Sequence, residues 1–285
     1  MDPASLVQPY GRFIQTKNGR VYLEEFGPED GIALVMVHGL GGSTFSFRQN
    51  AAAFAAAGYR VLVLDLPGFG LSEKGISPDY SHPAQAETLR AVMDSAGVGQ
   101  AVLLGHSMGA NIILHFAKRY PERTLAIVTA AGAPMFKTGR KIQSLFLHFA
   151  PLARAGRVAL RHLVNRERVR GLLGRAVANP ATVSEAMVDG YYVRLTTGDW
   201  SSALIAMMVA YPGNKLDLDL TAITMPMLLI AGGKDRWVPL SQTLEWASGL
   251  PTVRCEVMIG AGHLLMDECP GEFNRLVLDF LASIQ

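Results

Sequence analysis

The sequence is short of the features that mark disulfide-rich, nucleic-acid-binding and membrane-spanning proteins. Its two cysteines, Cys255 and Cys269, lack the spacing of metal ligands. The 26 basic residues exceed the 24 acidic residues by only 2, so the net charge gives no indication of a nucleic-acid partner. No stretch reaches the roughly 18 apolar residues of a membrane span. We expect the cysteines to be buried thiols rather than a disulfide.

The start of the chain also lacks a secretory signal. Residues 1–5 show no basic group followed by an apolar run, which favours a cytoplasmic protein, although a chain trimmed of its signal would begin in the same way. What is present is a globular composition, in which 49% of the residues are hydrophobic and 18% are charged. A chain of 285 residues is long enough for one large α/β domain with its own core.

Short apolar runs alternate with helical patterns along most of the chain. Strands are expected at residues 32–37, 59–65, 100–104, 125–128, 227–230 and 253–259, and helices at residues 46–57, 83–97 and 110–120. Two further short runs flank Asn18 and Gly19 and predict an antiparallel hairpin at a sheet edge. Together these segments predict an α/β fold with a mostly parallel, roughly eight-stranded sheet and helices on both faces.

The alternation stops between residues 134 and 215, where helical segments follow one another without an obvious strand. We interpret this stretch as an inserted helical cap on a core domain formed by residues 1–133 and 216–285. The first half of the cap, from residue 137 to residue 175, is strongly basic and contains one acid, Glu167. Its basic residues are Lys137, Arg140, Lys141, Arg154, Arg157, Arg161, Arg166, Arg168, Arg170 and Arg175. This pattern indicates either a solvated basic face or a surface for weak contact with anionic lipid or acidic substrates.

A serine stands between an apolar strand and a helix at residues 105–109, Gly-His-Ser-Met-Gly. The Gly-x-Ser-x-Gly pattern alone occurs by chance in roughly one chain in seven, so its context decides. Here a strand precedes the pattern, and residues 110–117 carry large apolar groups at helical spacing. Gly105 and Gly109 leave room for a tight turn that presents the serine oxygen. We interpret Ser107 as a nucleophile, and a helix N-cap serine is the alternative.

Other polar groups also follow strands. His38 opens the glycine-rich loop 38–42, whose amides can converge on an anion, and Asp65 opens a second turn that we expect to brace the neighbouring loops. Asp235 and His263 follow the last two strands. Because ligands bind at the carboxyl ends of parallel strands, these groups are candidates for one site. His263 alone could be structural, but its place after a serine and an acid favours a catalytic role.

Serine, acid and histidine in this order can form a nucleophilic triad. A serine hydroxyl needs a base to remove its proton, and histidine, with a pKa near 6.5, can also return the proton to the leaving group. A carboxylate on the other ring nitrogen fixes the tautomer and stabilises the imidazolium. The chain order is that of α/β-hydrolases rather than that of chymotrypsin-like or subtilisin-like enzymes.

The sequence resembles the α/β-hydrolase fold family over nearly its whole length. The matches, in the family's order, are residues 38–42, 105–109, 233–235 and 262–263. The resemblance implies that Ser107 is the nucleophile, His263 the general base and acid, and Asp235 the orienting acid. It also implies an oxyanion hole formed by the backbone amides of Leu40 and Met108, and neither a metal nor an organic cofactor.

The resemblance does not fix the substrate. Ser107 excludes the branches with an aspartate nucleophile, the epoxide hydrolases and haloalkane dehalogenases. The leading interpretation is a carboxylic ester hydrolase that acts on small or medium acyl esters through an acyl-enzyme. The alternative is a carbon–carbon bond hydrolase of aromatic ring-cleavage products, to which residues 235–239 and 272–274 are similar. That group usually has asparagine before the serine and tryptophan after the histidine, where this chain has His106 and Leu264.

Lactonase, thioesterase and perhydrolase activities stay open, as does a ligand-binding or receptor protein that keeps the fold without turnover. We expect a small-molecule ester as partner, and neither nucleic acid nor a membrane span. The oligomeric state is not indicated.

Four residues are expected near the substrate: Gly39, His106, Val238 and Leu264. Large apolar residues of the cap can line the acyl pocket or pack in the core: Met135, Phe136, Phe146, Phe149, Met207 and Met208.

Overall fold

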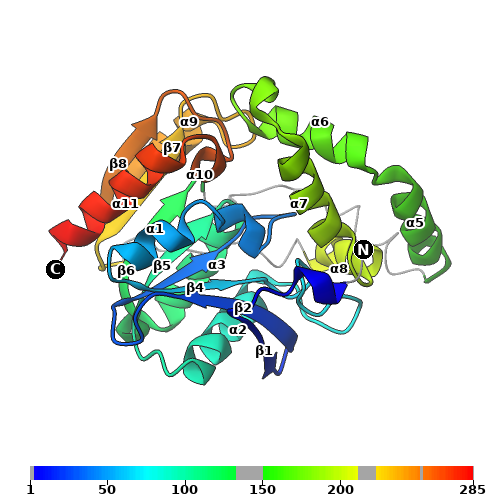
Figure 1. Cartoon of the computed structure of the whole chain (residues 1–285), viewed down its shortest axis with the longest axis horizontal. Helices are drawn as coiled ribbons and strands as arrows, with labels where there is room; N and C mark the ends of the chain where they lie inside the picture. The colour runs from blue at the N-terminus through cyan, green and yellow to red at the C-terminus, as the bar shows by residue number, and fades with distance from the viewer. Residues whose placement is uncertain (1–2, 133–149, 211–222, 251–252, 285) are drawn as a thin grey trace.

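A computed structural model describes residues 3–132, 150–210, 223–250 and 253–284, and its described strands form a single sheet (Figure 1). The strands are β1 Gly11–Thr16, β2 Gly19–Phe26, β3 Ala33–Val37, β4 Arg60–Leu64, β5 Ala101–His106, β6 Thr124–Ala130, β7 Met227–Gly232 and β8 Val253–Met258. Their order across the sheet is β1-β2-β4-β3-β5-β6-β7-β8. Only the pairs β1–β2 and β2–β4 are antiparallel among the described strands, and the other five pairs are parallel, which confirms the mostly parallel, eight-stranded sheet.

The predicted hairpin lies at one edge of this sheet. β1 pairs with β2 in a register that sets Thr16 opposite Gly19. Gly19 has a φ of +104°, a conformation that costs glycine little because it has no Cβ atom. The hairpin prediction is therefore confirmed, together with its place at the edge.

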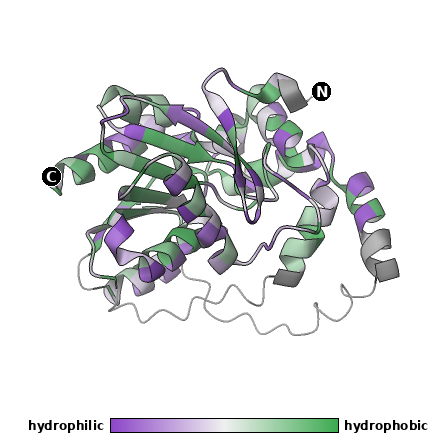
Figure 2. Ribbon diagram, turned by 90° about the horizontal axis from the view of Figure 1, so that it is seen from below, coloured by the Kyte–Doolittle hydropathy of each residue, from purple (hydrophilic) through white to green (hydrophobic). Residues whose placement is uncertain are grey.

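Side chains of the central strands alternate between two hydrophobic clusters. In β3, Leu34 and Met36 belong to one cluster, and Ala33, Val35 and Val37 belong to the other. All five residues are buried, as expected for a parallel strand covered on both faces. Figure 2 shows hydrophobic residues along the strands and hydrophilic positions on the surrounding helices.

Helices cover both faces of the sheet. Phe54 of α1 (Ala51–Ala56) and Phe273 of α11 (Pro270–Ser283) belong to the first cluster, with the short α10 (Leu265–Glu268) beside α11. The second cluster contains Leu89, Ile112 and Trp246, which come from α2 (His82–Ser95), α3 (Met108–Arg119) and α9 (Leu240–Ser248). Short 3-10 helices occupy η1 Pro3–Leu6, η2 Thr44–Phe47, η3 Pro121–Arg123 and η4 Pro180–Thr182.

One predicted helix is divided in two. The sequence predicts a continuous helix over residues 46–57, but the structure has η2 followed by the separate helix α1. Ser43 accepts a hydrogen bond from the amide of Phe45, and the Ser46 side chain accepts one from the amide of Ser43. This local capping favours a short turn close to the loop after β3.

Four helices occupy the described part of the predicted cap, between β6 and β7: α5 Ala150–Leu163, α6 Arg166–Ala176, α7 Glu185–Thr196 and α8 Trp200–Ala210. α5 packs on α8 and α6 packs on α7, so the helices pair with each other. Figure 1 shows all four on one side of the molecule, over the ends of the strands. Their division from the core as a separate domain stays a prediction.

The basic face of the cap is smaller than the sequence indicates. Arg166 forms ion pairs with Glu185 at 2.5 Å and Asp189 at 2.6 Å, and Arg170 also pairs with Glu185. These acids come from α7, beyond the basic stretch, so a count along α5 and α6 misses them. Contact with anionic lipid stays a prediction. None of the described helices has the length and apolar character needed to cross a membrane.

The cysteines are more exposed than expected. Cys255 lies in β8 and Cys269 immediately precedes α11, and both are free thiols with partly exposed side chains. The expectation of thiols rather than a disulfide is therefore confirmed, whereas the expectation that they are buried is wrong. For Cys255 the reason is that β8 is the last strand of the sheet, so that it is less covered than the central strands.

Candidate active site

The turn at Ser107 requires the two glycines that flank it. Ser107 joins β5 to α3 with a φ of +51°, and its amide donates to the carbonyl oxygen of Ala130 at 2.9 Å. A Cβ atom on Gly105 would lie 2.5 Å from the carbonyl oxygen of Gly109. A Cβ atom on Gly109 would lie 2.2 Å from that of Val37. Only glycine fits at both positions, as the sequence pattern predicts.

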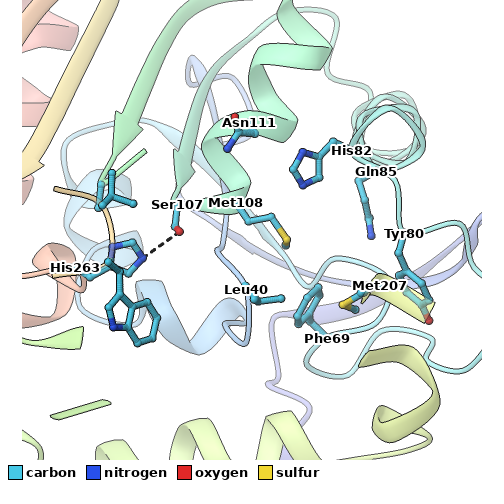
Figure 3. A pocket seen from close by; sticks show the side chains of 13 residues that line it. Leu40, Phe69, Tyr80, His82, Gln85, Ser107, Met108, Asn111, Met207 and His263 are labelled. Atoms are coloured by element: carbon cyan, nitrogen blue, oxygen red, sulfur yellow. Dashed lines mark hydrogen bonds between the residues drawn. The ribbon is translucent and has the colours of Figure 1, made fainter. Parts of the chain in front are cut away.

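The structure brings Ser107, His263 and Asp235 together in one line of hydrogen bonds (Figure 3 shows the serine and the histidine). The distance from Ser107 Oγ to His263 Nε2 is 3.0 Å, and that from His263 Nδ1 to Asp235 Oδ2 is 2.8 Å. The histidine and aspartate side chains are only 3% and 1% exposed. With Nδ1–H donating to the carboxylate, Nε2 is free to accept the serine proton.

The second carboxylate oxygen of Asp235 is also occupied. Oδ1 accepts hydrogen bonds from the amides of Trp237 at 2.8 Å and Val238 at 2.9 Å. Backbone bonds then join this loop to the one that carries the histidine: Gly233 N–H to Met258 O and Lys234 N–H to Ala261 O, both at 2.9 Å. The acid is therefore held in orientation before any ligand binds.

His263 is also held through its backbone and by its ring neighbours. His106 Nε2 donates to the carbonyl oxygen of His263 at 2.9 Å, and the two rings lie 4.9 Å apart. The Trp237 ring lies 5.0 Å from that of His263. Burial, followed by the proximity of His263, lowers the pKa of His106 to about 3. His106 is therefore neutral near pH 7 and keeps the Nε2 proton that it donates.

The end of α6 contacts the histidine loop. The amide of His263 donates to the carbonyl oxygen of Ala176 at 2.6 Å. Glu268 links the same two segments, since its carboxylate accepts from the amides of Ala178 at 2.6 Å and Gly262 at 2.9 Å. A Cβ atom on Gly262 would lie 2.6 Å from Ala176 O, so glycine permits this close approach.

The glycine-rich loop after β3 is shaped by His38. Its Nδ1 donates to the carbonyl oxygen of Gly39 at 2.8 Å, and its Nε2 accepts from the amide of Leu66 at 3.0 Å. Burial lowers the pKa of His38 to about 4, so the ring is neutral near pH 7. A bond from Gly42 N–H to Gly39 O at 3.0 Å closes the turn.

Leu40 and Met108 both line the same cavity as Ser107. Within the described residues neither of their amides donates a backbone hydrogen bond. Met108 also begins α3, where the helix dipole favours a negative charge. The oxyanion-hole role of these two amides stays a prediction, which this geometry supports.

Asp65 has a structural place rather than a catalytic one. It is fully buried, and its carboxylate accepts from the amides of Thr44 and Leu71, both at 2.6 Å. These contacts connect the loops after β3 and β4, as expected for the second turn. Phe69 of the same turn also lines the cavity beside Ser107. The sequence did not predict this position, because the turn was expected only to brace the neighbouring loops.

Comparison with known protein families agrees with this geometry. The model of the alpha/beta hydrolase fold family matches residues 32–270, which is more than half of the chain. The chain belongs to the α/β-hydrolase family.

Several relatives share this fold and much of the length. At 33% identity, a match covers 87% of this chain and 86% of a 2-hydroxy-6-oxononadienedioate/2-hydroxy-6-oxononatrienedioate hydrolase from Burkholderia vietnamiensis. At 29% identity, another covers 93% of this chain and 92% of a 2-hydroxy-6-oxo-6-phenylhexa-2,4-dienoate hydrolase from Burkholderia cepacia. A solved meta-cleavage product hydrolase from Pseudomonas fluorescens IP01 superposes with a TM-score of 0.80 and 20% identity, covering 97% of this chain and 99% of that one. The last likeness concerns the fold alone.

Two cavities lie near the site of this α/β-hydrolase, and the first of them is lined by Ser107. The first cavity has a volume of about 380 Å³ and is lined by Leu40, Phe69, Tyr80, His82, Gln85, Ser107, Met108, Asn111, Ala131, Met207, Trp237, Val238 and His263 (Figure 3). The second cavity, of about 100 Å³, lies on the other side of Leu40 and Trp237 and includes Gly39, His106, Leu172, Tyr191 and Leu264. The two cavities share Leu40 and Trp237 as lining residues.

The expected substrate residues divide between these cavities. Val238 and Met207 line the first, whereas Gly39, His106 and Leu264 line the second. Met208 is 44% exposed and is not among the described lining residues of either cavity. The remaining expected pocket residues, Met135, Phe136, Phe146 and Phe149, lie outside the described residues.

Sequence reasoning missed the polar residues of the first cavity. His82 and Gln85 lie in the first turn of α2, and Asn111 lies in the first turn of α3. All three are buried, a position that polar side chains seldom occupy in helices. Their only signal in the sequence is that they interrupt the apolar face of each helix, which does not reveal a common cavity.

Proposed function

We propose that this chain is a serine hydrolase that cleaves a carbon–carbon bond beside a ketone, in a substrate of the 2-hydroxy-6-oxo-dienoate class. The observation that carries the hydrolase part is the hydrogen-bonded line of Ser107, His263 and Asp235, at 3.0 and 2.8 Å. The substrate class is supported by the names of relatives at 33% and 29% identity. These names favour the carbon–carbon hydrolase over the carboxylesterase as the leading interpretation.

In the proposed reaction, Ser107 Oγ attacks the ketone carbon while His263 Nε2 takes the serine proton. The amides of Leu40 and Met108 would donate to the oxyanion, each typically worth about 3 kcal/mol. In the 2-oxo tautomer of the substrate, the electron pair of the breaking carbon–carbon bond passes into the conjugated enone. Protonated His263 returns a proton to the leaving fragment, and water then hydrolyses the acyl-enzyme. Overall, one water yields an acid and a 2-hydroxydienoate.

Ester hydrolysis is the second candidate, because it uses the same groups with an alcohol as the leaving fragment. A specific observation favours it: neither lysine nor arginine lines the two cavities among the described residues, so none of these residues offers a charge partner for a dienoate carboxylate. His106 and Leu264 also replace the asparagine and tryptophan usual in ring-cleavage hydrolases.

Parallel kinetics would test the proposal. We expect the purified chain to hydrolyse 2-hydroxy-6-oxo-6-phenylhexa-2,4-dienoate with a higher kcat/KM than p-nitrophenyl butyrate, and a fluorophosphonate to label Ser107 stoichiometrically. Ser107→Ala should abolish both turnover and labelling. A higher kcat/KM for the ester would make the second candidate the function. Labelling without turnover of either substrate would favour a ligand-binding protein, and turnover by Ser107→Ala would contradict the mechanism.

A further inference from the structure

The first cavity has a polar group of side chains away from the catalytic histidine. His82, Gln85 and Asn111 all line it and are 1%, 2% and 3% exposed. Figure 3 shows them across the cavity from His263, with Ser107 and Met108 between. Three buried polar side chains from two helices are not needed to pack an apolar cavity, so a ligand group at this end would find hydrogen-bond partners.

Gln85 defines what kind of group this end can bind. Its Nε2 donates to the carbonyl oxygen of Pro67 at 3.1 Å, and since that carbonyl only accepts, the amide orientation is fixed. Oε1 is buried and has no hydrogen-bond partner among the described residues. An unpaired buried acceptor is unfavourable, so this position favours a ligand that donates a hydrogen bond.

The charge of the group follows from its neighbours. Burial, followed by the nearby His115, whose ring lies 6.0 Å away, lowers the pKa of His82 to about 4, so the imidazole is neutral near pH 7. Gln85 and Asn111 carry no charge, and lysine and arginine do not occur among the described residues of the cavity. A neutral donor therefore fits this end better than a carboxylate does.

The walls between the serine and this end are mostly apolar. Leu40, Phe69, Met108 and Met207 line the cavity, and the hydroxyl of Tyr80 is already used, since it donates to Gly75 O at 2.8 Å. A ligand that spans the cavity would thus be apolar along its length and polar at its far tip.

We propose that His82, Gln85 and Asn111 form a subsite for a hydroxyl group at the end of the substrate's acyl arm. This inference rests on the proposed function, in which His263 protonates the leaving fragment. That fragment lies on the side of His263, so the opposite end of the cavity takes the acyl arm. The hydroxyl donates to Gln85 Oε1, and the other two side chains surround it.

A chain-length series tests the subsite. p-Nitrophenyl esters of unbranched acids with four to ten carbons are compared with their ω-hydroxy counterparts. Because a site built to bind a hydroxyl discriminates against its absence, we expect kcat/KM for the hydroxy ester to exceed that of its partner by about tenfold at one length. A ratio below one at every length would overturn the proposal.

Two variants remove the subsite independently. Gln85→Met keeps a similar volume and should lower the hydroxy preference at least fivefold, as estimated from one lost hydrogen bond of about 1 kcal/mol. Asn111→Leu removes a polar neighbour of the hydroxyl and should lower the preference by a smaller factor. Met207→Leu reshapes the same cavity without changing its polarity, so the ratio should persist there. Thermal unfolding checks that each variant folds. An undiminished preference in both subsite variants would overturn the assignment.

A binding measurement separates this inference from the proposed reaction. Ser107→Ala is titrated by calorimetry with the N-methyl amides of the same acids, which need no turnover. Tighter binding of the ω-hydroxy amide supports the subsite even if the chain cleaves neither dienoate nor ester. Equal or weaker binding overturns the subsite, and leaves the hydrolase proposal to be decided by the kinetics.

Discussion

His106 donates from Nε2 to the backbone oxygen of His263, across 2.9 Å and 157 positions of the chain. The residue that precedes the serine in the turn therefore fixes the loop that carries the histidine. Both residues are buried, and their rings lie 4.9 Å apart. The serine turn and the histidine loop are thus positioned relative to each other by a contact separate from the bond between Ser107 and His263.

Removing this donor should slow the reaction. In His106→Phe the ring volume is kept but the hydrogen bond is lost, and we expect kcat/KM to fall about tenfold, which corresponds to about 1.4 kcal/mol. His106→Gln can still donate and should recover most of the loss. Steady-state kinetics and the rate of fluorophosphonate labelling measure the effect. Equal rates for the wild type and His106→Phe would show that the contact does not matter.

The same residue should make stability depend on pH. Because the pKa of His106 is lowered to about 3, the unfolded chain binds a proton below pH ~6.5 that the folded chain does not. The contribution of His106 to the free energy of unfolding is therefore fully present above pH ~6.5 and is lost progressively as the pH falls below that value. At pH 5 the loss should reach about 2 kcal/mol relative to pH 7.5.

Urea unfolding of the wild type and His106→Phe at both pH values isolates this effect. The decrease in the free energy of unfolding from pH 7.5 to pH 5 should be about 2 kcal/mol smaller in the variant. Glu24, whose pKa burial raises to about 7, acts in the opposite direction, but it is present in both proteins and cancels. The same decrease in both proteins would mean that His106 is protonated in the folded state.

The strands and the triad could be predicted because their signals are local. A run such as residues 33–37 is apolar throughout, and Ser107, Asp235 and His263 each follow a strand at a short distance. The parallel sheet then brings the carboxyl ends of these strands together, so that residues more than a hundred positions apart meet without any signal of their own.

The cavity could not be predicted in the same way. Gln85 and Asn111 look like ordinary helix residues, and only the packing of α2 against α3 turns both toward one space. The charge of the cap is a second example, since the acid partners of Arg166 follow it by about twenty positions on another helix. Contacts between helices depend on how they dock, and periodicity within one helix does not specify docking.

Glu268 should couple the cap segment to the histidine loop. Its carboxylate oxygens accept from the amides of Ala178 and Gly262. Glu268→Gln sets an NH₂ group against one of these donors, so we expect about 1–2 kcal/mol lower stability and several-fold lower kcat/KM. Glu272→Gln, at an exposed position of α11, is the matched control and should change neither quantity. Unaltered kinetics in Glu268→Gln would separate the cap contact from catalysis.

The backbone strain at Ser107 predicts that a glycine variant is more stable than an alanine variant, which reverses the usual order of stability. A φ of +51° with ψ of −115° is unfavourable for any residue with a Cβ atom, at a cost of about 1–3 kcal/mol. Both Ser107→Ala and Ser107→Gly lose the hydroxyl and the bond to His263, so they differ in the Cβ atom alone. We expect the glycine variant to be more stable by about 1 kcal/mol, although glycine elsewhere usually destabilises through the unfolded state.

Urea unfolding of the two Ser107 variants checks this order of stability, and Ala131 provides an independent case. Ala131 has a φ of +47° at the end of β6, so Ala131→Gly should also stabilise the chain while all three residues of the triad are retained. Greater stability of Ser107→Ala than of Ser107→Gly would mean that the turn relaxes once the hydroxyl is removed. In that case the strain would be imposed by the bond to His263 rather than by the close packing of Gly105 and Gly109.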